Sequence, residues 1–147
     1  KAIIKKSEFN FIFNEIKINK KINYKNKKIF FLFYFRKHKN KKYYFLKDFL
    51  KKLILKKLPI VIIGDKLNLK GLKNCGYISH KKVTNLLHKT RYSSVSNENI
   101  FNFFTIDCIN NNVKLLIDKK SYSLIKNHKK YFLNYDFKKN NLKKLNI

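Results

Sequence analysis

The most regular pattern of hydrophobic and polar positions lies between residues 43 and 58. Apolar side chains recur three or four positions apart from Tyr43 to Ile54, and lysines fill the opposite positions. This spacing is typical of an amphipathic helix. Pro59 is expected to end it, because proline cannot continue a helix. The sequence therefore predicts a helix over residues 43–58 with one apolar face and one lysine face.

Other apolar runs have the character of strands. Residues 29–35 are continuously apolar and predict a fully buried strand or a packed arm, and residues 60–63 predict a short strand. Residues 101–109 are rich in strand-favouring side chains and predict a third strand. Between them, the glycine spacing is not that of a phosphate-binding loop and predicts simple turns. These turn glycines are Gly64, Gly71 and Gly76.

Two short helices are expected near the C-terminus. Asn110 can cap a helix over residues 111–119. Ser121 can cap a second helix that carries Tyr122, Leu124 and Ile125 and can extend to Tyr131 and Phe132. The predicted fold class is therefore α+β. It consists of a small domain with a short β-sheet or hairpin and C-terminal helices, preceded by a long basic N-terminal extension that contains the amphipathic helix.

Charge indicates the class of partner. The 147 residues include 36 lysines and arginines but only 8 acidic residues, which gives a formal net charge of +28 at pH 7. So much like charge opposes a compact state unless a polyanion neutralises it, which predicts a nucleic-acid partner. Only Arg36 and Arg91 are arginines. Because lysine is a point charge and arginine is the residue that reads guanine edges, we expect backbone binding rather than sequence reading.

The charge also divides the chain into three predicted parts. These are a basic extension over residues 1–58, a small RNA-binding domain over 59–137 and a basic tail over 138–147. The tail is rich in lysine and asparagine, so disorder or a helix formed on RNA are both open. The sequence starts at Lys1 and contains no methionine, which is expected for a fragment of a longer product. Either removal of a targeting peptide or a missing start explains this.

Two segments are the main candidate RNA contacts. Residues 79–91 combine lysines suited to phosphates with polar side chains suited to sugar and phosphate hydrogen bonds, although a solvated surface loop is the alternative. Residues 36–42 carry too much charge to pack without counterions. They form a solvated loop or lie on phosphates, and the net charge of the chain favours the phosphates. The complete set of candidate RNA-binding residues is Ser79, His80, Lys81, Lys82, Asn85, His88, Lys89, Thr90, Arg91, Lys114, Lys119, Lys120, Arg36, Lys37, Lys39, Lys41 and Lys42.

The sequence shows no constellation for catalysis or metal binding. The acidic residues are scattered singly, so no carboxylate pair for acid–base or two-metal chemistry is visible. Cys75 and Cys108 have no CxxC partner and no histidine at ligand spacing, which favours buried free thiols over zinc or a disulfide. No apolar run approaches the roughly 20 residues that span a bilayer. We therefore expect no enzymatic activity, cofactor, metal, small-molecule substrate or membrane insertion.

Several landmarks resemble a known family. Residues 81–92, KKVTNLLHKTRY, are similar to a segment of the bacterial-type large-subunit ribosomal protein twenty-eight. Residues 76–80 resemble the turn that precedes that segment, and residues 117–120 resemble the Ile-Asp-Lys-Lys that ends the family's short helix. A second placement sets residues 88–92 on the family's Lys-Thr-Arg-Arg stretch, so the register between His80 and Tyr92 stays open.

The resemblance implies a small α+β domain that binds large-subunit rRNA beside neighbouring ribosomal proteins. Because lysine, asparagine, isoleucine and phenylalanine have AT-rich codons, we expect an organellar protein, with the mitochondrion first and a non-photosynthetic plastid as the alternative. Residues 60–78 faintly resemble the glycine-spaced motif of the twenty-fourth large-subunit protein, which leaves another rRNA-binding family open. An RNA-processing or maturase subunit, and a membrane-surface protein using residues 43–58, are the remaining hypotheses.

Overall fold

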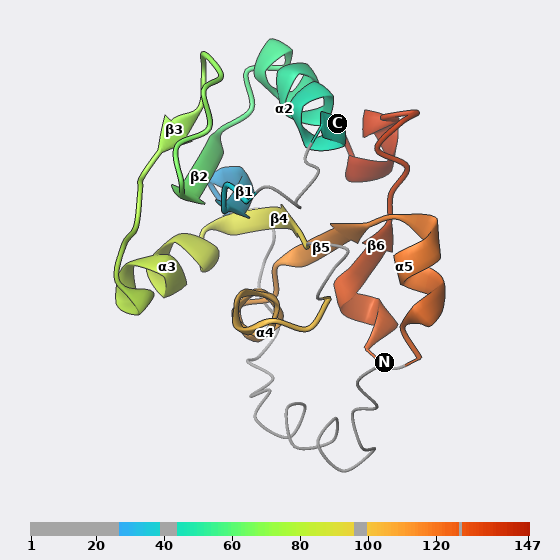
Figure 1. Ribbon diagram of the computed structural model, residues 1–147. Coiled ribbons are helices and arrows are strands. Elements are labelled where there is room, and N and C mark those ends of the chain that lie inside the picture. Colours follow the sequence, from blue (N-terminus) through green and yellow to red (C-terminus); the bar gives the residue numbers. More distant parts are fainter. Residues whose placement is uncertain (1–26, 39–43, 96–99, 127) are drawn as a thin grey trace.

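A single parallel sheet organises the chain. The computed structural model describes residues 27–38, 44–95, 100–126 and 128–147 (Figure 1). The strand order is β3-β2-β1-β4-β5-β6, and every neighbouring pair runs parallel. The strands are β1 (Ile29–Phe35), β2 (Ile60–Gly64), β3 (Lys73–Asn74), β4 (Thr90–Ser94), β5 (Lys114–Ile117) and β6 (Phe132–Asn134).

Helices cover both faces of the sheet. Along the sheet, the connection from β1 to β2 runs towards β3, whereas the connection from β4 to β5 runs towards β6. Because such crossovers are right-handed, the two connections lie on opposite faces of the sheet. One face carries α2 and the C-terminal segment 135–147, whereas α3, α4 and α5 cover the other (Figure 1). The helices are α2 (Tyr44–Leu55), α3 (His80–Leu87), α4 (Phe103–Asn110) and α5 (Lys119–Leu124), with short 3-10 helices η2 (Lys129–Tyr131) and η3 (Leu142–Leu145).

The core is built on the central strand β1. Phe31 and Phe33 pack towards α2, and Leu32 packs towards the opposite layer. The ring of Phe49 on α2 makes an edge contact with Phe31, at 5.1 Å between ring centroids. A parallel sheet is buried on both faces, so its strands read as continuous apolar runs. This explains the pattern of residues 29–35, and the predicted buried strand there is confirmed.

The predicted α+β fold class is wrong, because the sheet is entirely parallel and strands alternate with helices in an α/β fold. Two segments have the reverse of the predicted structure. The predicted strand over residues 101–109 is mostly α4, and the predicted helix over 111–119 contains β5. Asn102 explains the first error, since its side-chain Oδ1 accepts a hydrogen bond from the Thr105 N–H at 2.9 Å and caps the helix.

The predicted second C-terminal helix is present as α5 with a different cap, and it is shorter than predicted, because it ends at Leu124 and Phe132 lies in β6. Asp118 is the N-cap of α5, and its Oδ1 accepts a hydrogen bond from the Ser121 N–H at 3.0 Å. Ser121, the predicted cap, lies buried inside the helix. The carboxylate takes this place because it accepts from the backbone N–H and the hydroxyl of Ser121 together.

The described parts of the predicted extension and tail, residues 27–38, 44–58 and 138–147, belong to the sheet domain. The predicted helix over 43–58 is observed as α2, and together with β1 it belongs to the central part of the fold. The tail also docks: Leu145 is buried, and its carbonyl accepts a hydrogen bond from the Tyr92 hydroxyl at 3.4 Å. Residues 1–26 and 39–43 of the predicted extension lie outside the described residues.

The glycine turns allow a stability prediction. Gly64 has φ +88°, and a Cβ there would lie 2.3 Å from the Phe35 carbonyl oxygen. Gly76 has φ +67° with no atom near its Cβ position. We expect Gly64→Ala to lower the free energy of unfolding by about 2 to 3 kcal/mol and Gly76→Ala by about 1 kcal/mol. Urea unfolding of both variants measures the difference, and equal losses would contradict the close approach at Gly64.

Candidate nucleic-acid interface

Basic side chains gather where the strands end. In a parallel α/β sheet all carboxyl ends lie at one edge, and this edge is the usual ligand-binding side. Here Arg36 and Lys37 follow β1, Lys119 and Lys120 follow β5, and residues 138–139 follow β6. We call residues 36–38, 65–66, 75–79, 118–120 and 135–139 the carboxyl edge. Five predicted RNA-binding residues from distant parts of the sequence thus share one side of the molecule: Arg36, Lys37, Ser79, Lys119 and Lys120.

The carboxyl edge is hollowed between β5 and β6. An open cavity of about 660 Å³ lies there, with the buried rings of Tyr135 and Phe137 contributing to its lining. Exposed lysines line it from two parts of the chain, the start of α5 and the C-terminal segment. We call this the lysine cleft, and its lysines are Lys119, Lys120, Lys138, Lys139 and Lys144.

The aspartates of the cleft are engaged in local structure. The Asp136 carboxylate accepts hydrogen bonds from the N–H groups of Lys138 at 2.9 Å and Lys139 at 3.1 Å. The bond from Lys139 above all holds the pKa of Asp136 below its ordinary value. At Asp118, burial raises the pKa, but the hydrogen bonds from Ser121 and neighbouring backbone outweigh it and hold the pKa low. Both carboxylates therefore stay ionised and shape the turns that present the lysines.

Within the part of the chain that the structure describes, the cleft lysines have no carboxylate partner. Among the residues that the structure places, Lys51 pairs with Asp48 at 3.7 Å, but no lysine of the cleft lies within ion-pair distance of a carboxylate. Like charges so close together repel each other, and phosphates placed between them would relieve that repulsion. The arrangement is suited to a polyanion.

A second group of polar contacts lies at the ends of β1 and β2. The Asp65 carboxylate accepts a hydrogen bond from the Tyr77 hydroxyl at 2.7 Å and another from the Lys37 N–H at 2.6 Å. The Tyr77 bond first, and then the Lys37 bond, lower the pKa of Asp65, and the same contact raises the pKa of Tyr77. Arg36 stands beside this pair and is exposed.

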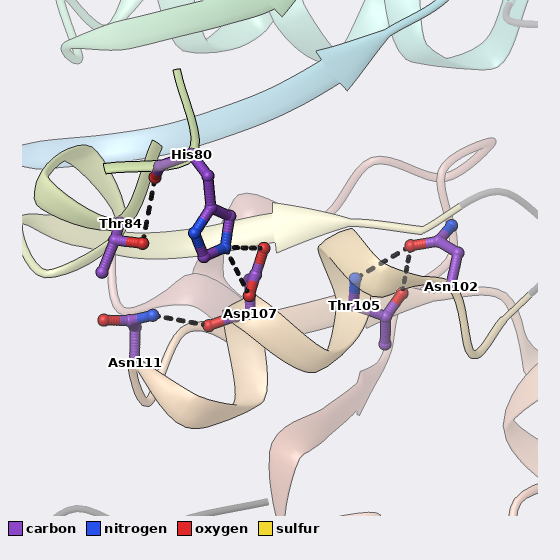
Figure 2. Close-up of polar contacts among 6 residues, drawn as sticks. All are labelled: His80, Thr84, Asn102, Thr105, Asp107 and Asn111. Atoms are coloured by element: carbon purple, nitrogen blue, oxygen red, sulfur yellow. Dashed lines mark hydrogen bonds and ion pairs between the residues drawn. The ribbon is translucent and has the colours of Figure 1, made fainter. Parts of the chain in front are cut away.

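The start of the predicted segment 79–91 forms the first turn of α3. Ser79 is the N-cap residue, and Lys81 and Lys82 are exposed. His80 is engaged instead with Asp107 on α4, with its Nε2 at 3.2 and 3.1 Å from the two carboxylate oxygens (Figure 2). This contact ties α3 to α4. The sequence reasoning missed it because Asp107 was assigned to a strand.

The rest of that segment lies away from the carboxyl edge. Asn85, His88 and Lys89 are exposed on the later part of α3 and on the turn before β4. Thr90 is fully buried, and its hydroxyl donates to the Leu86 carbonyl at 2.8 Å, so its role is structural. The segment therefore forms α3 and the start of β4, and RNA contacts by its exposed residues stay a prediction.

Arg91 and Lys114 line a second cavity, of about 480 Å³, on the α2 face of the sheet. Arg91 Nε donates to the Lys27 carbonyl at 3.1 Å, and Lys114 Nζ donates to the Lys130 carbonyl. Burial lowers the pKa of Lys114. Both side chains therefore have partners within the fold. Of the other predicted contacts, Lys39, Lys41 and Lys42 lie outside the described residues.

Lys27 is a basic residue with an internal role that the sequence did not indicate. It is only 3% exposed, and its Nζ donates to the carbonyls of Asn111 at 3.0 Å and Asn112 at 2.9 Å, after the end of α4. Burial lowers the pKa of Lys27 to about 8, and the opposing interaction with Cys108 is smaller.

The lowered pKa of Lys27 predicts a pH dependence of stability. From pH 8 to about 10.5 the folded state has lost the proton that the unfolded state still holds, so unfolding becomes less favourable as pH rises. Between pH 8 and pH 10.5 we expect the free energy of unfolding of the native protein to rise by about 1 to 2 kcal/mol more than that of Lys27→Met. This range already allows for solvent screening. Urea unfolding at several pH values tests this, with Lys28→Met as the control that removes an exposed ammonium. Parallel pH profiles for native protein and Lys27→Met would contradict it.

Within the described ranges, no group of three or more histidine, cysteine, aspartate and glutamate side chains could hold a metal ion. No helix in the same ranges is long and apolar enough to cross a bilayer. A scan against protein-family models and searches of curated proteins and solved structures each gave no match.

Proposed function

We propose that the chain is a structural RNA-binding protein of an organellar ribosome, which binds rRNA through lysine–phosphate contacts at the carboxyl edge. The lysine cleft is the observation that carries this proposal. It brings together five exposed lysines, and none of them has a carboxylate partner among the described residues. With a net charge of +28, the whole chain is suited to a polyanion much larger than a small ligand.

The local hydrogen bonds of the aspartate side chains also favour a binding role over catalysis. In the described residues Asp65, Asp118 and Asp136 each accept a backbone N–H, and Asp107 pairs with His80. A general base or a two-metal site needs carboxylates free to meet a substrate or a metal. These carboxylates instead hold turns and helices in place.

The mode of binding follows from lysine chemistry. A flexible ammonium contacts phosphate oxygens in many geometries, so it supplies affinity with little base selectivity. Binding is therefore expected to release counterions and to weaken steeply as salt rises. A protein of this kind neutralises and bridges RNA segments that would otherwise repel each other.

We extend the proposal to the large subunit because of the sequence resemblance, and to the mitochondrion because of codon usage. The α+β fold implied by the resemblance to the twenty-eighth large-subunit protein is not the fold observed. The subunit is therefore decided best by experiment.

Sedimentation of ribosomal subunits tests the proposal. The tagged chain is followed through gradients of a mitochondrial lysate at high salt, and we expect it with the large subunit. Recovery with the small subunit would contradict the large-subunit assignment alone. Recovery in the ribosome-free fractions would contradict a ribosomal function.

A further inference from the structure

Tyr77 is an exposed aromatic residue whose orientation is fixed. It lies between β3 and α3 and is 68% exposed. Its hydroxyl donates to the Asp65 carboxylate at 2.7 Å. A side chain that serves only the fold would gain little from exposing an apolar ring to water. Its fixed, open position calls for another explanation.

The support under Tyr77 is itself held by the sheet. The Asp65 N–H donates to the Phe35 carbonyl at 2.8 Å, and the Asp65 carboxylate accepts from the Lys37 N–H at 2.6 Å. The N–H of Gly64 donates to the carbonyl of Gly76, directly before the tyrosine, at 2.9 Å. The ring is thus attached to the carboxyl ends of β1 and β2. Binding to it costs little conformational entropy, because the support is already ordered.

Cationic groups stand beside the ring. Arg36 is exposed and close enough to influence the pKa values of both Asp65 and Tyr77. It has no hydrogen bond or ion pair of its own within the part of the chain that the structure describes. Lys37 is exposed as well. The site therefore combines a flat apolar ring with positive charge.

We propose that Tyr77 is a stacking platform for an unpaired RNA base, with Arg36 and Lys37 binding the adjacent phosphates. This inference rests on the proposed function and names the single-stranded form of RNA as the ligand at this site. Proteins stack unpaired bases on aromatic rings, and the bases of an RNA duplex are not accessible for this. Asp65 binds the hydroxyl end of the ring and so orients it.

Binding of two RNA probes tests the platform. The probes are a single-stranded oligouridylate and a blunt-ended RNA duplex, which has no unpaired base, measured with the full chain over a range of salt. We expect Tyr77→Ala to weaken oligouridylate binding about 5- to 100-fold, as for loss of one stacked base, with an unchanged salt slope and unchanged duplex binding. Tyr77→Phe keeps the ring but loses its attachment to Asp65, so we expect a smaller loss.

Two further variants separate stacking from other effects. Leu124→Ala is the matched control, because Leu124 is also 68% exposed but has no aromatic face, and we expect native binding. Arg36→Ala removes a phosphate contact, so we expect it to reduce the salt slope by about 1.

The outcomes distinguish this inference from the function it rests on. If the native chain binds oligouridylate and Tyr77→Ala binds it equally well, the platform is overturned and the proposed function stands. Equal losses on both probes with a reduced salt slope also overturn the platform, because stacking is independent of salt. If the native chain binds neither RNA, the proposed function itself fails. Circular dichroism of each variant ensures that folded proteins are compared.

Discussion

Replacing Phe49 by alanine is expected to lower the free energy of unfolding by about 3 to 5 kcal/mol, the range for a large buried aromatic residue. Phe49 is fully buried on α2 and meets three rings edge-on. Its centroid lies 5.1 Å from that of Phe31 and 5.4 Å from those of Tyr135 and Phe137. It therefore joins the central strand to the C-terminal segment, and its loss removes contacts to both.

Phe103→Ala is the matched control for this prediction. Phe103 is also a helical phenylalanine but is 89% exposed, so we expect a change within about 0.5 kcal/mol. Urea unfolding followed by circular dichroism, at a salt concentration that screens the lysines, measures both variants. A similar small loss for Phe49→Ala would mean that α2 and the C-terminal segment do not pack as described.

Removing three charges from the lysine cleft is expected to have the largest effect on RNA binding. The triple variant Lys138→Gln, Lys139→Gln and Lys144→Gln replaces each ammonium by a neutral amide and so removes the charges from one wall of the cleft. If each lysine contacts one phosphate, the salt slope should fall by about 2 to 3, and affinity near 0.1 M salt should fall on the order of 100-fold. Titration of a labelled rRNA fragment at several salt concentrations measures both quantities.

A second triple variant controls for net charge. Lys56, Lys57 and Lys89 precede β2 and β4, so they lie towards the opposite edge of the sheet, and all three are exposed. Changing these three to glutamine removes the same charge with a much smaller expected loss. Equal losses for the two triple variants would show that binding follows net charge alone and that the cleft has no special role.

Sequence reasoning worked best where one physical signal dominated. The buried strands β1 and β2 appeared as continuous apolar runs, and α2 appeared through its helical period. It failed at β4, whose sequence TRYSS is mostly polar. Ser94 is nevertheless buried there, because its hydroxyl donates to the Leu116 carbonyl on β5 at 3.2 Å. Such a cross-strand partner cannot be recognised before the strand order is known.

The errors near the C-terminus have a tertiary cause as well. Residues 103–110 contain many strand-favouring side chains, yet capping by Asn102 and burial of Cys108 and Ile109 make them helical. The prediction placed a strand where α4 lies and a helix where β5 lies. The predicted elements therefore did not alternate between strand and helix, and the α/β class was not recognised. Tertiary packing outweighs intrinsic propensity in such short segments.

The candidate site was predictable only in part. Charge alone indicated Arg36, Lys37, Lys119 and Lys120, which the fold places at the carboxyl edge. The lysines of residues 138–144 were assigned to a tail, because nothing local shows that buried Leu145 anchors them. Tyr77 had no signal of its own, since its place depends on Asp65, 12 residues earlier in the sequence.

Lysine footprinting tests the central claim most directly. The free chain and its complex with rRNA are acetylated briefly, and modification at each lysine is quantified by mass spectrometry. We expect RNA to protect Lys119, Lys120, Lys138 and Lys139 at the carboxyl edge, while Lys56, Lys57 and Lys89 stay reactive. Protection of the second group with continued reactivity of the first would contradict binding through the carboxyl edge.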